Sequence, residues 1–190
     1  FSDIAFTCKE TGEQLIIGTT RPELVCTCGM VIYNPEDKRY KHLQGKTAIT
    51  SIFNKEVPIK AHSIAQIDKG TGLVMMCSAG DVTDIQFFRE MKLKPVIAIT
   101  KEGRMNNIAK QFEGLKVKEA REKIIEELKK NSLIVKQENI VHRTPVSERS
   151  GAEIEFIQMP EYYLKQLEFL PKIKKLLSKI TFCPENSRNI

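Results

Sequence analysis

The sequence has no tryptophan, only three histidines and no pair of cysteines in the C-x-x-C spacing. Five cysteines, an odd number, argue against a disulfide framework and favour a reducing compartment, so we expect a cytoplasmic protein. His42, His62 and His142 stand at no metal-ligand spacing from a second ligand, so we expect neither a metal nor a cofactor. The sequence also lacks a membrane-length apolar run and a charged-then-apolar leader, so no membrane partner is expected.

Length and charge indicate a globular chain. With 190 residues, of which 41% are hydrophobic, the chain can bury a full core, and we expect one domain with an appendage that behaves as a monomer. Thirty Lys and Arg against 24 Asp and Glu give a formal charge of +6, which favours a polyanionic partner. The start at Phe1 and the polar end are typical of a segment excised from a longer protein.

The first hundred residues are rich in β-strand signals. Two short β-prone runs, 4–7 and 14–17, flank a Thr11-Gly12 turn, which predicts a hairpin. So many short strands with non-local pairings predict an α/β, β-rich fold, a small barrel or strongly curved sheet with helices around it. The other predicted strands are 25–33, 47–53, 56–61, 73–77 and 96–100.

Helical signals are fewer and lie mostly in the second half. An apolar stripe follows Asp81, and a clearer one over 117–130 ends at Asn131. Residues 162–180 predict two helical pieces interrupted by Pro171. The stripe after Asp81 consists of Val82, Ile85, Phe88 and Met91.

Two acidic residues, Asp81 and Asp84, stand at the start of the predicted helix. As the N-cap, Asp81 would accept hydrogen bonds from first-turn amides, and Asp84 would take the third helical position, where a capping-box acid usually sits. A functional interpretation is equally open. The helix N-terminus would keep the Asp84 carboxylate ionised, and Gly80 would let the backbone approach a ligand, so the anion could bind an ammonium group.

A second polar segment, Thr19-Thr20-Arg21, precedes Pro22. Because proline cannot donate to a β-ladder, the strand should end here and leave Thr19 and Arg21 facing a cavity. Arg21 has two predicted partners. It either pairs with Glu23 at the surface or pairs with Asp81 and orients the turn that carries Asp84.

The order and spacing of these segments resemble the editing, or connective polypeptide, domain of valyl-tRNA synthetase, most closely the archaeal type, within the class I valyl, isoleucyl and leucyl editing family. The resemblance covers about residues 1–157, and residues 158–190 are similar to the helical segment that leads back to the synthetase catalytic domain. The segments that carry it are Thr19 to Glu23, Asn34 to Gly45, Val57-Pro58-Ile59, Gly70-Thr71-Gly72, Gly80 to Asp84 and Glu102 to Met105.

The resemblance implies a role for each site residue. Asp84 would bind the α-ammonium of the misattached amino acid, and Asp81 would order the rim of the pocket. Thr19, Thr20 and Arg21 would line the pocket and, with Asp84, serve the reaction. Three further residues, Leu24, Met75 and Cys77, would form the substrate-binding wall.

Those three wall residues also depart from the family pattern. Bacterial members place a lysine and a threonine where this chain has Met75 and Cys77, and a threonine where it has Leu24. An isoleucyl or leucyl parent, or a tRNA-binding module that has lost hydrolysis, therefore remains an alternative. The Glu23-Leu24 and Gly80-Asp81 pairs favour the valyl parent.

The implied activity is post-transfer editing, the hydrolysis of the ester of mischarged threonyl-tRNA(Val). A valine-shaped pocket rejects threonine by only about 100-fold, a figure known for valyl-tRNA synthetase itself rather than obtained from this sequence, so a second site must remove the error. No Ser-His-Asp or Cys-His set is evident, which predicts a positioned water rather than a Cys77 nucleophile. The implied partners are the acceptor end of tRNA(Val) and the remainder of the parent synthetase.

Overall fold

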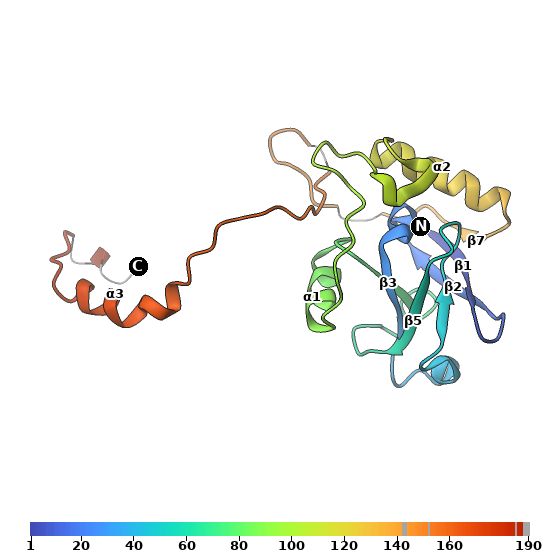
Figure 1. Ribbon diagram of the computed structural model, residues 1–190, viewed down its shortest axis with the longest axis horizontal. Helices are drawn as coiled ribbons and strands as arrows, with labels where there is room; N and C mark the ends of the chain where they lie inside the picture. The colour runs from blue at the N-terminus through green and yellow to red at the C-terminus, as the bar shows by residue number, and fades with distance from the viewer. Residues whose placement is uncertain (142–143, 152, 185, 188–190) are drawn as a thin grey trace. The chain divides into compact units, whose positions relative to one another are not determined.

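The computed structural model describes residues 1–141, 144–151, 153–184 and 186–187, and His142 lies outside them. The chain forms two compact units, Phe1–Gln158 and Met159–Ile190. The first unit contains seven strands, two α-helices and three 3-10 helices among the described residues (Figure 1). The strands are β1 (Ser2–Cys8), β2 (Gln14–Thr19), β3 (Cys28–Tyr33), β4 (Thr47–Ile49), β5 (Glu56–Ala61), β6 (Leu73–Cys77) and β7 (Ile134–Gln137).

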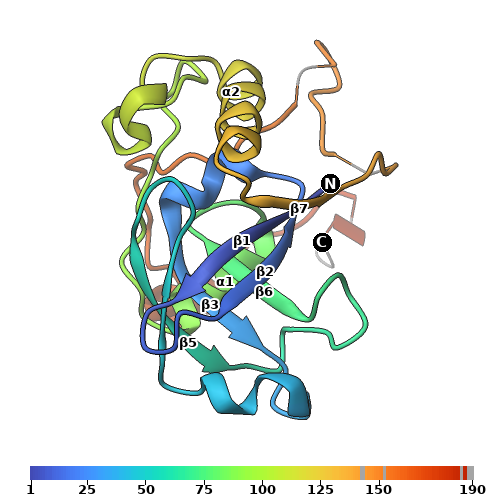
Figure 2. The same ribbon diagram turned by 90° about the vertical axis from the view of Figure 1, so that its right-hand side faces the viewer.

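The sheet of the first unit is a nearly closed, barrel-like sheet in a mixed α/β fold, as the sequence predicts. Its strand order is β2-β1-β4-β5-β3-β6, with β7 paired to β1. All of these pairs are antiparallel except β3 with β5, which is parallel. The two ends of the path, β2 and β6, lie side by side, and the Thr71 hydroxyl just before β6 donates to the Ile16 carbonyl of β2 at 2.6 Å (Figure 2). This near-closure brings the end of β2 and the end of β6 to one place.

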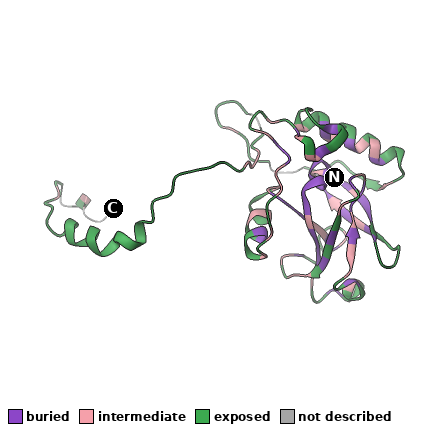
Figure 3. Ribbon diagram, in the orientation of Figure 1, coloured by how far each residue is buried: buried purple, intermediate pink, exposed green. Residues whose placement is uncertain are grey.

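The predicted hairpin is confirmed. Strands β1 and β2 pair antiparallel, with Ile4 opposite Ile17 and Phe6 opposite Leu15. All four side chains are buried, because alternate residues of each strand point into the sheet's core. Figure 3 shows buried residues running along the strands of the first unit.

The strand predicted over 25–33 begins too early. Residues Pro22–Thr27 form a 3-10 helix, η1, and β3 starts only at Cys28. Pro22 stands in the first helical turn, where its missing N–H costs nothing, and the Thr27 hydroxyl donates to the Leu24 carbonyl at 2.8 Å. The 3-10 turn therefore replaces the first part of the predicted strand.

Two other predicted strands are also wrong in extent. Strand β4 ends at Ile49 rather than at residue 53, because Ile52 and Asn54 adopt positive φ values of 61° and 52° in a turn. The run 96–100 forms no strand and contributes one isolated bridge, between Ile99 and Met105. The segment that contains Met105 continues almost at once into η3 (Asn107–Phe112), so the run has no partner strand long enough for a ladder.

The two predicted helices of the first unit are confirmed as α1 (Val82–Glu90) and α2 (Val117–Lys130), and Asn131 caps the C-terminus of α2. The predicted stripe of α1 is partly wrong, since Val82 is 56% exposed whereas Phe87 is buried with Phe88. The Phe87 ring packs edge-on against His62, 5.0 Å away, and this aromatic contact turns Phe87 rather than Val82 to the core. Strands β3 and β5 are joined through η2 (Lys38–Leu43) and β4.

The second unit has a 3-10 helix, η4 (Gln166–Phe169), followed directly by α3 (Leu170–Leu177). Pro171 does not separate the two pieces as predicted. It lies in the first turn of α3, where proline fits. The helix α3 buries none of its residues, and within the described part of the chain no helix is long and apolar enough to cross a membrane.

Candidate functional site

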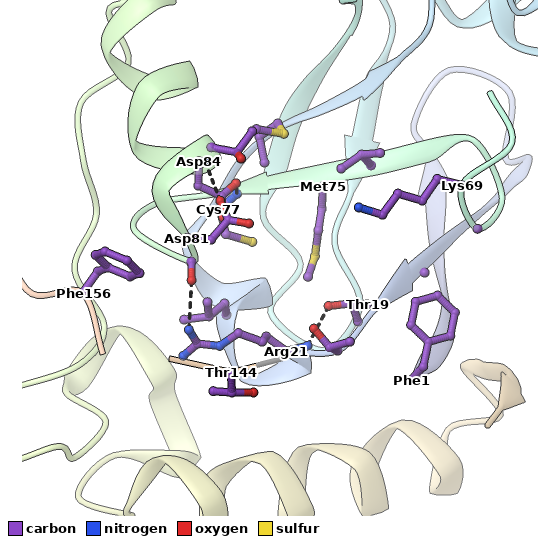
Figure 4. Close-up of a pocket in the computed structure, with 18 of the residues that line it drawn as sticks. Phe1, Thr19, Arg21, Lys69, Met75, Cys77, Asp81, Asp84, Thr144 and Phe156 are labelled. Carbon is purple, nitrogen blue, oxygen red and sulfur yellow. Dashed lines mark hydrogen bonds between the residues drawn. The ribbon is translucent and has the colours of Figure 1, made fainter. Parts of the chain in front are cut away.

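A pocket of about 800 Å³ opens in the first unit where the ends of β2 and β6 meet the start of α1. Figure 4 shows Asp81 and Asp84 on one side of this pocket and Lys69 and Phe1 on the other. All eight residues that the sequence places in the site line it: Thr19, Thr20, Arg21, Leu24, Met75, Cys77, Asp81 and Asp84. The fold therefore brings together two segments that are about sixty residues apart.

Asp81 caps α1 as predicted, but Asp84 does not complete a capping box. The Asp81 carboxylate accepts a hydrogen bond from the Asp84 amide at 2.8 Å. The Asp84 carboxylate turns instead toward β6, where its Oδ1 accepts from the Cys77 amide at 3.1 Å. Asp84 therefore contributes a pocket-lining acid rather than a second cap.

The prediction that the helix N-terminus keeps Asp84 ionised is wrong, because stronger effects favour the protonated carboxyl. Burial, and then the negative charge of Asp81, raise the pKa of Asp84 from 3.8 to about 7. The hydrogen bond from the Cys77 amide and the positive charge of Arg21 act in the opposite direction but are weaker. The carboxyl is thus poised between its two protonation states at neutral pH.

Gly80 is needed for this arrangement because any side chain at this position would overlap with the Asp84 carboxylate. A Cβ atom on Gly80 would lie 2.3 Å from Asp84 Oδ2 and 3.2 Å from Leu24 Cδ1. The sequence predicted that Gly80 allows close approach of a ligand. In the structure, the group that occupies the space is the Asp84 carboxylate itself.

On the opposite wall, Thr19 ends β2 and is only 7% exposed. Its hydroxyl oxygen accepts from the Arg21 amide at 2.9 Å, which turns the chain away from the ladder ahead of Pro22. Thr20 lies between them and is partly buried. The predicted strand end is therefore present, and both threonines line the pocket.

Arg21 does not pair with Asp81. Its Nε donates to Glu23 Oε1 at 3.0 Å, one of its terminal nitrogens donates to the Gly80 carbonyl at 3.0 Å, and the other binds the Glu155 carboxylate. The alternative pairing with Glu23 is present, but Glu23 is fully buried rather than at the surface. Arg21 still joins the two segments, through a backbone carbonyl instead of a carboxylate.

Sequence reasoning missed two partners of this cluster, Arg121 and Glu155. Arg121 of α2 donates to both oxygens of Glu23, at 3.0 and 2.9 Å. Glu155 lies 134 residues from Arg21 along the chain. No local pattern marks either residue, because their roles depend on how α2 and the segment around residue 155 pack against η1.

Leu24, Met75 and Cys77 form the less polar wall. Leu24 and Cys77 are buried, and Met75 is partly exposed. Figure 4 shows Met75 and Cys77 among the residues that line the pocket. A side-chain hydrogen bond with Cys28, its neighbour on β3, and then burial raise the pKa of the Cys77 thiol well above its usual value. A thiol held in its neutral form is a poor nucleophile, which agrees with the predicted wall role.

The histidines that can be described take no part in the site. His42 contacts Glu13 at 2.9 Å, and His62 lies 3.6 Å from Glu90. Neither lines the pocket. Over the described ranges, which omit His142, no group of three or more His, Cys, Asp or Glu residues is arranged to hold a metal ion.

Comparison with solved structures places the fold in a known class. The structure is similar to the LeuRS of Agrobacterium radiobacter K84 (agnB2) in a ternary complex with tRNA and LeuAMS, with a TM-score of 0.53 and 16% identity, covering 68% of this chain and 19% of that one. It is also similar to GlLeuRS-CP1, with a TM-score of 0.50 and 13% identity, covering 67% of this chain and 85% of that one. At these identities the likeness concerns the fold, which is that of the CP1 editing domain.

The sequence relatives are valine–tRNA ligases. Those of Nanoarchaeum equitans and Rickettsia akari are both 46% identical, over 97% and 94% of this chain, and that of Aeropyrum pernix is 43% identical over 97%. No family model matches. The chain is therefore homologous to one segment of the valine–tRNA ligases, and it spans 22–24% of the length of these relatives. The predicted resemblance is confirmed.

Proposed function

We propose that this chain is the editing domain of a valyl-tRNA synthetase and hydrolyses the ester of mischarged threonyl-tRNA(Val). The observation that carries the proposal is the position of Asp84. Its side chain lines the same pocket as Thr19 and Thr20, and Figure 4 shows Thr19 across the pocket from Asp84. An aminoacyl ester has an ammonium group, a side chain and a scissile carbonyl within a few ångströms, and this pocket offers groups for each.

Asp84 would bind the α-ammonium. With a pKa of about 7, the Asp84 carboxyl is only partly ionised at neutral pH. An ammonium group in contact with the carboxylate would stabilise the ionised form. The Cys77 amide holds Oδ1, so Oδ2 is the oxygen left for the substrate. The anchor fixes the amino acid in the pocket and leaves the ester carbonyl beside the threonine hydroxyls.

Hydrolysis would use a positioned water. Oriented hydroxyls can hold such a water near the carbonyl, and proximity alone supplies a large part of an enzymatic rate enhancement. The Cys77 thiol is buried and neutral, so no step passes through a thioester. Arg21 makes no separate contribution as a base or acid, because its pKa is raised by Glu23 and Glu155 despite burial.

The partners follow from the same proposal. The acceptor end of tRNA(Val) delivers the ester, and the remaining three quarters or so of a valine–tRNA ligase would hold the tRNA and activate the amino acid. The +6 charge is consistent with contact to phosphates. Residues 158–190 would lead back to the catalytic domain. The parent enzyme would be cytoplasmic, and its editing unit would act as a monomer.

Calorimetry with small ligands tests the proposal without the absent parent enzyme. A non-hydrolysable threonyl-adenosine analogue should bind, and Asp84→Ala should abolish the binding. The valyl analogue should bind less tightly, because it leaves buried polar groups that await the hydroxyl unpaired, at about 1–3 kcal/mol. Tighter binding of an analogue that carries an isoleucyl- or leucyl-type error would indicate an isoleucyl or leucyl parent. Binding of the threonyl analogue without any hydrolysis of the corresponding ester would indicate a tRNA-binding module that has lost hydrolysis.

A further inference from the structure

Glu23 is a charged residue in a place where charge is costly. Its side chain is fully buried, and two arginines hold it. Arg121 donates to both of its oxygens, and Arg21 donates through Nε to Oε1. A buried ion pair contributes little net stability compared with apolar packing, so its presence calls for another explanation.

Every nitrogen of the Arg21 guanidinium already binds the protein, so three of its five N–H groups are engaged. Nε is bound to Glu23, and the two terminal nitrogens are bound to the Gly80 carbonyl and to Glu155. The side chain is 22% exposed, so these bonds form where water competes weakly. Arg21 thus connects η1 with the turn that precedes α1, although it lines the pocket.

The turn it connects is the one that sets Asp84. The Gly80 carbonyl accepts from Arg21, and Asp84 Oδ2 lies directly over the space where a Gly80 Cβ would be. The next residue, Asp81, holds the Asp84 amide. A displacement of the Gly80 backbone would therefore move the carboxylate that faces the pocket.

We propose that Glu23 is a positioning residue of the site. Together with Arg121 it fixes the Arg21 guanidinium, so that Arg21 holds the Gly80 carbonyl and keeps the Asp84 carboxylate in place. The inference rests on the proposed editing function for its kinetic consequence, but its structural part can be measured without any activity.

The activity test is a double-mutant cycle on deacylation of threonyl-tRNA(Val). Glu23→Gln keeps the shape of the side chain and should lower kcat/KM about tenfold, within the range seen for coupled neighbours. In an Arg21→Gln background the same change should cost less than about twofold, because the connection is already broken. Equal losses in both backgrounds would mean that Glu23 does not act through Arg21, and would overturn the proposal.

Amide hydrogen exchange gives the independent readout. The Cys77 amide donates to Asp84 Oδ1, so its exchange reports the position of the carboxylate. Glu23→Gln should accelerate exchange at Cys77 and Asp84 by about tenfold relative to the chain's global exchange. Unchanged exchange at both amides would overturn the proposal even if the chain proved inactive, whereas inactivity with accelerated exchange would count only against the editing function.

Asp37→Asn is the matched control. Asp37 is another buried carboxylate paired with an arginine, Arg39 at 2.6 Å, and it does not line the pocket. The Asp37→Asn change should lower thermal stability without changing kcat/KM or the exchange of the Cys77 amide.

A second variant serves if Glu23→Gln fails to fold. Arg121→Gln removes the other arginine that binds Glu23 and should give the same changes in kcat/KM and Cys77 exchange, at smaller size. Equal effects of Asp37→Asn and the Glu23 or Arg121 variant would reduce Glu23 to a general stabilising role and refute positioning.

Discussion

The backbone amide of Cys77 donates a hydrogen bond to the carboxylate of Asp84 at 3.1 Å. This bond links the last residue of β6 to the first turn of α1, and it directs the acid into the pocket instead of back onto its own helix. Of the two acids, Asp81 caps the helix, whereas the Asp84 carboxylate accepts from Cys77 and lines the pocket. A ligand-binding role for Asp84 stays a proposal.

Removing the carboxylate should therefore abolish deacylation while leaving the fold intact. Loss of one partner of a buried charged pair costs roughly 2–5 kcal/mol, or about 30-fold to several thousandfold, so we expect Asp84→Ala to lose activity on that scale. Single-turnover deacylation of threonyl-tRNA(Val) measures this, with the melting temperature as the check on folding. A variant that melts earlier and hydrolyses normally would contradict the ammonium-anchor role.

The raised pKa of Asp84 predicts a dependence of activity on pH. Ammonium binding needs the carboxylate, so kcat/KM should rise as pH rises through about 7, up to the pH of about 8 at which an ordinary α-ammonium group itself loses its proton. The background hydrolysis of the ester, measured with Asp84→Ala, has to be subtracted at each pH. A corrected profile that is flat from pH 5.5 to 8.5 would show that Asp84 ionisation does not limit the reaction.

The same raised pKa predicts that the ionised Asp84 carboxylate lowers the stability of the fold. The folded chain holds a proton on Asp84 that the unfolded chain releases above its ordinary pKa of 3.8, so this residue's contribution to stability falls as pH rises from about 4 to 7. Asp84→Asn removes the effect and should raise the free energy of unfolding at pH 8 by on the order of 2 kcal/mol, with a smaller difference near pH 4. Urea unfolding at both pH values measures this, and a destabilised variant at pH 8 would contradict it.

Gly80 offers a second way to move the carboxylate. In Gly80→Ala the new Cβ would meet Asp84 Oδ2 at 2.3 Å, so the acid must shift, and we expect kcat/KM to fall by at least about tenfold. Gly29→Ala is the control, because its Cβ would meet the Phe88 ring at 2.6 Å, away from the pocket lining. The control should lose stability and keep activity. Full activity in Gly80→Ala would mean that the carboxylate position is not critical.

Cys77 provides the test of mechanism. If the thiol only forms the pocket wall, Cys77→Ser should change kcat by less than about threefold. The buried, neutral state of the thiol supports this expectation. A loss on the order of a thousandfold in a folded variant would indicate covalent catalysis and would replace the positioned water.

Much of the fold could be predicted from local patterns. The β1–β2 hairpin and the helices α1 and α2 follow from turn chemistry and apolar periodicity, and they appear at the expected positions. The errors occur where a local preference competes with a longer-range one. Pro22 starts a 3-10 helix in a run that is otherwise typical of a strand, and residues 96–100 have strand composition but no partner strand.

The site was predicted as a set of residues but not as a network. Motif resemblance identifies Thr19, Arg21 and Asp84, and near-closure of the sheet brings them to one pocket. The pairing of Arg21 with Gly80 and Glu155 could not be predicted, because it depends on distances across 59 and 134 residues of chain. The raised pKa of Asp84 was likewise out of reach, since burial outweighs the helix N-terminus only once the pocket exists.

The central claim, that this pocket selects threonine for hydrolysis, is tested most directly by comparing deacylation of threonyl-tRNA(Val) and valyl-tRNA(Val) by the purified chain. Equal tRNA and enzyme concentrations should be used, with Asp84→Ala as the inactive reference. We predict that the threonyl ester is hydrolysed at least about tenfold faster, because the valyl side chain cannot satisfy the polar groups that receive the hydroxyl. Equal rates, or faster loss of the valyl ester, would contradict the account.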